Sequence, residues 1–193
     1  ITCRDWSSDV CSSDLNSKFA SFCLLSKGMY RFELEIPYPF ALVMNNESED
    51  ALEVMPAYWW MYNMYALLRN ERKFEQRDTR HVKKQLVEYY ALAPDTVEEI
   101  FTGMEKLESC AGIAWYRSEG LALPDNEDEV REKGKKVLLG EHAVIDRLEV
   151  LGTDMENSKR PVRILKPRKA YKAYRHMVRW YAITALADYL AHN

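Results

Sequence analysis

Residues 30–46 read YRFELEIPYPFALVMNN, and this stretch decides which fold we expect. From Tyr30 to Ile36, apolar residues alternate with charged residues, and this period of two is typical of a strand with one buried face. Pro37 and Pro39 follow. Because proline cannot donate to a strand ladder, the strand should lie at an edge or leave its sheet here. The stretch therefore predicts a small β segment.

The sequence around this stretch extends the prediction to a β segment followed by helices. We expect strands over Phe19–Val43 and a polar loop at Asn45–Asp50. Residues 57–77 contain no Gly or Pro and are apolar nearly all round up to Arg69. This pattern predicts a helix that starts at Pro56 and whose first half is buried. The predicted fold class is therefore mostly α with a short N-terminal β segment.

The middle of the chain predicts further, shorter elements. Residues 81–92 form one element, which the pattern allows to be helix or strand. The next helix should begin at Asp95 or Thr96, because both residue types are good N-caps. Two short helices broken near Gly140 should follow, and residues 152–167 are polar and basic, as in a loop or crossover.

The first residues of the chain do not fit this pattern. Residues 5–15 read DWSSDVCSSDL, with neither a helical nor a strand period. This run matches a translated sequencing-library adapter, so we interpret residues 1–15 as an adapter-derived, disordered segment and exclude them from fold reasoning. The alternative is a disordered Ser/Asp-rich leader. On the adapter interpretation, the protein begins upstream of Asn16 and the chain is a C-terminal fragment.

Composition excludes several function classes. Of the 193 residues, 47% are hydrophobic and 30% are charged, which is the composition of a globular chain. The net charge of −3, or −1 without residues 1–15, argues against nucleic acid as a partner of the whole chain. No signal peptide or membrane span is evident. Four cysteines without metal-type spacing predict no metal site and a reducing cytoplasm.

Four stretches resemble one bacterial protein family. They are YRFELEIPYPFALVMNN, LEVMPAYWWMYNMYALLRNERKF, YALAPDTVEEI and ILKPRKAYKAYRHMVRWYA. Together they are similar to the C-terminal region of domain-of-unknown-function family 4954. Longer members of that family carry a left-handed parallel β-helix like that of the trimeric LpxA-like acyltransferases.

The resemblance implies an architecture and partners. Residues 16–50 would be the terminal β-helix coil and its exit strands, and residues 51–193 would be a helical domain. The implied partners are an upstream β-helix domain of the same protein and further copies in a homo-trimer. The resemblance does not supply any catalytic residue or cofactor.

The helix after Pro56 carries a candidate ligand site. Its aromatic rings could stack a sugar or nucleobase, and its polar residues could contact phosphate. The candidate residues are Trp59, Trp60, Asn63, Asn70, Lys73 and Arg77. The alternative is a buried helix whose basic residues form a solvated face.

A second candidate site is a basic patch around the start of a long closing helix, which we expect to begin at Pro167. It could bind RNA, a nucleotide or an acidic protein surface, or its residues could form ion pairs with acidic residues of the same chain. The patch residues are Arg163, Lys166, Arg168, Lys169, Lys172, Arg175 and Arg179.

Three functions remain open from the sequence. The first is a helical cap or accessory domain of a larger β-helix protein, related to sugar-nucleotide metabolism. The second is the substrate lid of a nucleotidyltransferase-like or acyltransferase-like enzyme that binds a phosphorylated or nucleotide-sugar ligand. The third is a module that binds RNA or protein. The chain has no Gly-rich phosphate loop or nucleophile elbow, so no catalytic residue is assigned.

Overall fold

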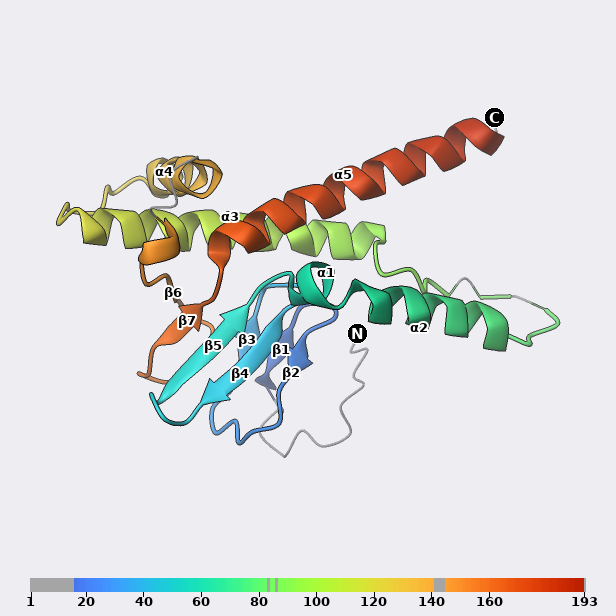
Figure 1. Cartoon of the computed structure of the whole chain (residues 1–193), viewed down its shortest axis with the longest axis horizontal. Helices are drawn as coiled ribbons and strands as arrows, with labels where there is room; N and C mark the ends of the chain where they lie inside the picture. The colour runs from blue at the N-terminus through green and yellow to red at the C-terminus, as the bar shows by residue number, and fades with distance from the viewer. Residues whose placement is uncertain (1–15, 83, 86, 141–144, 193) are drawn as a thin grey trace.

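The computed structural model describes residues 16–82, 84–85, 87–140 and 145–192, and it shows a mixed α/β fold (Figure 1). The strands are β1 (Lys18–Phe19), β2 (Leu24–Leu25), β3 (Glu35–Ile36), β4 (Leu42–Asn46), β5 (Ala51–Met55), β6 (Leu151–Gly152) and β7 (Val162–Ile164). The helices are α1 (Tyr58–Tyr62), α2 (Met64–Arg77), α3 (Pro94–Ser118), α4 (Glu127–Leu139), the 3-10 helix η2 (Ile145–Arg147) and α5 (Pro167–His192). The adapter interpretation falls on residues 1–15, which lie outside the described residues.

Two sheets organise the strands. β1 and β3 form a two-stranded parallel sheet, and the other sheet has the strand order β2-β4-β5-β7-β6. β4 and β5 form an antiparallel hairpin, in which Asn46 pairs with Ala51. β5 then pairs in parallel with β7, so that Leu52 lies beside Val162. The helices α1 to α4 all lie in the connection between these two strands.

The predicted fold class, a mostly α chain that follows a β-helix coil, is wrong. The described residues contain a five-stranded mixed sheet and no left-handed β-helix. Parallel pairs displaced by 17 and 18 positions join β1 to β3 and β2 to β4, but each spans only two residues. A β-helix needs this parallel pairing to continue, whereas β4 turns back into β5. The β4–β5 hairpin also spans residue 50, where we predicted the boundary between the β-helix coil and the helical domain.

The sequence missed β5 and β7 because both strands are short, with five and three residues. β5 is almost wholly buried, since strands flank it on both edges and helices lie over the sheet. In the sequence, β5 runs directly into the apolar residues around Pro56, and periodicity does not separate such a short apolar stretch from the start of a buried helix. β7 lies inside the segment predicted as a loop or crossover.

Helices α3 and α5 lie over the five-stranded sheet on one side, and α4 packs on α3 (Figure 1). Their buried faces share one core cluster with the strands. Its members include Ile36, Phe40, Val43, Leu52, Val54, Ile100, Leu107, Val162, Ile164, Tyr171, Tyr174 and Met177. The prediction of a long closing helix from Pro167 is confirmed by α5.

The predicted helix after Pro56 differs in two ways. It breaks at Asn63, where φ is −143°, so α1 and α2 are separate helices. Its first half is not buried: α1 has no buried residue, and Leu67 is the buried residue of α2. α2 extends away from the sheet, so most of its faces have no core to contact (Figure 1).

Two further local predictions need correction. The described residues between 81 and 92 form neither helix nor strand. Helix α3 begins at Pro94 with Ala93 as its N-cap, and neither Asp95 nor Thr96 takes that place. Instead, the Thr96 hydroxyl accepts a hydrogen bond from the Ala93 backbone N–H at 2.8 Å, which is one half of a capping box.

Glycines let α3 and α4 approach each other closely. A Cβ at Gly134 would lie 1.8 Å from the Glu108 carbonyl oxygen, and a Cβ at Gly112 would lie 2.2 Å from the Val130 carbonyl oxygen. Both obstacles are backbone atoms, so a side chain can be added only if the helices move apart.

We therefore expect Gly134→Ala to lower the free energy of unfolding by more than about 2 kcal/mol, despite the better helix propensity of alanine. Urea unfolding followed by circular dichroism measures this loss. The control is Gly28→Ala, whose Cβ would meet its nearest neighbour at an ordinary 3.5 Å. Equal stability of Gly134→Ala and the parent would contradict the close packing of α3 on α4.

Arg160, held in a buried ion pair with Glu156, attaches the segment before β7 to the β4–β5 hairpin. Arg160 donates to both carboxylate oxygens of Glu156, whose side chain is 0% exposed, and Arg160 also donates to the Asn45 side-chain oxygen at 2.7 Å. Removing one partner of a buried pair leaves an uncompensated charge.

Glu156→Ala should cost about 3 kcal/mol or more of stability, because it leaves the Arg160 guanidinium without its main partner. The matched control is Glu49→Ala, which removes an ion pair with Arg163 where the Glu49 side chain is 54% exposed. That loss should stay below about 1 kcal/mol. Thermal unfolding of both variants in parallel gives the comparison, and similar losses would show that the Glu156 pair does not hold the segment.

Candidate functional site

The structure divides the predicted ligand site between the core and an exposed helix. Trp59 and Trp60 lie in α1, half-buried, and pack against the core cluster. Asn63 is the half-buried residue at the break between α1 and α2. The other three candidates, Asn70, Lys73 and Arg77, are exposed on α2. Trp59 and Trp60 therefore pack on the core, and the polar residues of α2 form a solvated face.

The predicted basic patch is also divided. Arg163 makes ion pairs with Glu49 and, at 2.7 Å, with Glu149. Arg168 lies 3.6 Å from Asp146 and donates to the Gly140 carbonyl at 2.5 Å. Arg163 and Arg168 therefore form ion pairs with acidic residues of the same chain. The exposed members are Lys166, Lys169, Lys172 and Arg179, and Arg175 is half-buried.

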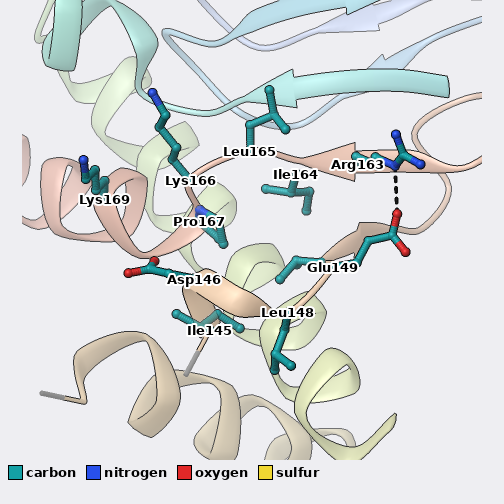
Figure 2. A pocket seen from close by; sticks show the side chains of 11 residues that line it. Ile145, Asp146, Leu148, Glu149, Arg163, Ile164, Leu165, Lys166, Pro167 and Lys169 are labelled. Atoms are coloured by element: carbon teal, nitrogen blue, oxygen red, sulfur yellow. Dashed lines mark hydrogen bonds and ion pairs between the residues drawn. The ribbon is translucent and has the colours of Figure 1, made fainter. Parts of the chain in front are cut away.

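A cavity of about 450 Å³ lies between η2, β7 and the start of α5 (Figure 2). Ile145, Leu148, Ile164 and Leu165 are among its apolar lining residues. Its charged lining residues are Asp146, Glu149, Arg163, Lys166 and Lys169. Figure 2 shows Arg163 and Glu149 joined across one end of the cavity. None of the six predicted ligand residues lines this cavity, so it is a different place from the predicted site.

Lys166, a residue of the predicted basic patch, contacts the helix that carries Trp59 and Trp60. Its Nζ donates to the Tyr62 hydroxyl at 2.9 Å and lies 4.8 Å from the Tyr62 ring centre. Lys166 has a φ of +52°, immediately before α5 begins at Pro167. The hydrogen bond from Lys166, together with the nearby charge of Lys169, lowers the pKa of the Tyr62 phenol. The end of α1 is thus fastened to the start of α5, a contact that no local sequence pattern indicates.

Burial shifts the pKa values of several thiol and phenol groups in the described part of the chain. Burial raises the pKa of the Cys23 thiol to about 12 and also raises the pKa of Cys110, so neither is an activated nucleophile. Burial, together with the neighbouring Glu108 carboxylate, raises the pKa of Tyr171. Among the residues that the structure describes, no three His, Cys, Asp or Glu side chains could hold a metal ion.

The surface that sequence reasoning missed is the second half of α5. We call residues 180–191 the arm, which extends beyond α3 to the C-terminal end (Figure 1). Its large apolar side chains are 59% to 66% exposed. They are Trp180, Ile183, Leu186, Tyr189 and Leu190. A sequence signal for the arm exists, because Thr184 and Asp188 are its polar residues and a helix that is apolar all round needs cover.

Comparisons with known proteins show that the chain is similar to part of a longer protein. No family model and no solved structure matches it. It is 41% identical over 184 residues to an uncharacterized protein of Treponema pallidum (strain Nichols). The match covers 95% of this chain, which spans about a quarter (24%) of the relative's length. The resemblance to family 4954 stays a prediction.

In the described part of the chain, no helix is both long enough and apolar enough to cross a membrane.

Lys166→Gln should raise the pKa of the Tyr62 phenol, because the variant removes the cation that stabilises the phenolate. An NMR titration of ring-labelled tyrosine measures this, with Tyr62→Phe assigning the signal. Lys172→Gln is the control, because Lys172 is exposed further along α5. An unchanged Tyr62 titration in Lys166→Gln would contradict the contact between α1 and α5.

Proposed function

We propose that this chain is a non-catalytic docking domain of a longer polypeptide, and that the arm binds an amphipathic helix. The observation that carries the proposal is the exposure of five large apolar side chains along one projecting half-helix. Together they present on the order of 600 Å² of largely apolar surface. A soluble monomer rarely exposes one apolar patch of that size unless the patch is an interaction site.

The chemistry of the arm favours an apolar protein partner. Asp188 is its charged residue, so the arm offers little to RNA, phosphate or a charged protein surface. Side chains on a helix form ridges, and the grooves of another helix accept such ridges along their whole length. A partner helix with its own apolar stripe would therefore cover the arm.

The relative supports a docking role within a longer protein. The Treponema pallidum protein has about three quarters of its length outside the matched region. The proposal keeps the predicted accessory-domain role and the predicted protein-binding role. It leaves aside the predicted substrate lid, because none of the six candidate residues lines the cavity beside β7 and three of them are exposed on α2.

Amide hydrogen exchange of the arm tests the proposal. Two titrants are used: the chain itself at high concentration, and the part of the Treponema pallidum relative outside the matched region. At least one should slow exchange over residues 180–191 tenfold or more, because covering the helix suppresses its opening. If neither titrant slows exchange, the docking function is wrong.

A pair of arm variants provides the matched control. Ile183→Glu places a charge within the exposed apolar surface and should abolish the protection. Ala185→Glu adds the same charge to the same helix on the opposite side from Ile183, and it should leave the protection intact. Equal effects of the two variants would point to general helix fraying instead of docking.

A further inference from the structure

Resting on the docking function proposed above, we infer that the partner helix is the arm of a second copy of this chain, packed antiparallel about a two-fold axis. The position, spacing and side-chain sizes of the arm residues lead to this inference. It names the partner that the docking proposal leaves open.

The arm carries a seam with coiled-coil spacing. Trp180, Ile183, Ala187 and Leu190 recur at intervals of three, four and three residues. This is the a/d spacing with which two helices pack along their length. All four residues are exposed, so the seam is available to a partner. The buried residues of α5, such as Tyr174 and Met177, lie on a different side of the helix.

The seam is complementary to itself in the antiparallel direction. Aligned about residue 185, Trp180 lies opposite Leu190 of the second copy, and Ile183 lies opposite Ala187 of the second copy. A two-fold axis repeats each contact, as an isologous interface requires. Every layer then combines a larger with a smaller side chain. A parallel pair would instead put Trp180 against Trp180 and leave Ala187 facing Ala187, which crowds one layer and underfills another.

The placement of the arm also favours the antiparallel pair. The C-terminus is at the end of the arm furthest from the sheet (Figure 1). The arm is about 18 Å long, so antiparallel arms hold the two folded bodies at opposite ends of the pair. Parallel arms would bring the two bodies side by side. Asp188 lies on a different side of the helix from Ile183, so like charges do not face each other across the seam.

The area of the arm predicts a weak, reversible pair. Two copies that cover most of each other's arm would bury roughly 1,000 Å² in total, which is near the lower limit for a specific interface. We therefore expect a dissociation constant of roughly micromolar order.

Sedimentation velocity of the full chain over two orders of magnitude of concentration tests the pairing. The parent chain and Ala185→Glu should shift from monomer to dimer as concentration rises. Ile183→Glu should stay monomeric throughout. Because the sample contains no lipid, nucleic acid or second protein, a dimer requires a second copy as the partner. A parent chain that stays monomeric, or dimers that persist in Ile183→Glu, would overturn the inference.

Cysteine cross-linking tests the direction of the pair. The background carries Cys3→Ser and Cys11→Ser, and Ile183→Cys and Ala187→Cys are made as separate proteins. Mixing the two should give a disulfide-linked dimer in much higher yield than either protein alone, because position 183 faces position 187 across an antiparallel seam. Equal or greater yield from Ile183→Cys alone would show a parallel pair and overturn the register.

The two proposals fail in different ways. If the parent chain stays monomeric but the remainder of the Treponema pallidum relative slows exchange in the arm, self-pairing is wrong and docking stands. If neither partner slows exchange, both are wrong.

Discussion

The parallel pairing of β5 with β7 is the constraint on which the rest of the structure depends. Leu52 and Val162 are 110 positions apart in the sequence, yet they lie side by side in the sheet. The Leu165 N–H donates to the Val54 carbonyl at 2.8 Å, which continues the contact toward the start of α5. Arg160, paired with the buried Glu156, then donates to the Asn45 side-chain oxygen and so secures the segment before β7 to the hairpin. This pairing brings Lys166 within reach of Tyr62, and α5 starts beside α1 as a consequence.

Two buried phenols determine how α5 leaves the core. The Tyr174 hydroxyl donates to the Pro39 carbonyl at 2.7 Å, and the Tyr171 hydroxyl donates to Glu108 at 2.6 Å. A buried hydroxyl that lost such a partner would cost free energy, so these bonds fix the rotation of the helix as well as its position. The first half of α5 is thus anchored in the core, and the second half is presented to solvent in a defined direction. This arrangement favours binding at the arm, because the arm loses little conformational entropy when a partner binds.

Sequence patterns predicted an element correctly where its own residues are enough to define it. The helix from Pro167 was predicted correctly, because a proline suited to the first turn precedes a long run without Gly or Pro. The same reasoning gave one buried helix after Pro56 and was wrong, because apolar residues near Tyr65 have no core beside them. The alternation before Pro37 predicted a short β segment, the family resemblance implied a β-helix coil there, and neither indicated the five-stranded sheet. The candidate residues were predicted as two separate sets, and the contact between Lys166 of one set and Tyr62, which neither set contains, was not foreseen.

The sequence by itself determined that the chain contains long helices and that the last of them, α5, starts at a proline. Local propensity and periodicity act within one element, so a pattern of residues is enough to reveal them. Only the tertiary structure decided that β5 pairs with β7, that the indoles of α1 pack on the core, and that the buried stripe of α5 ends before Trp180. These outcomes depend on which distant segments of the chain pack against each other. The pairing that buries the most apolar surface is selected, and that depends on the whole chain.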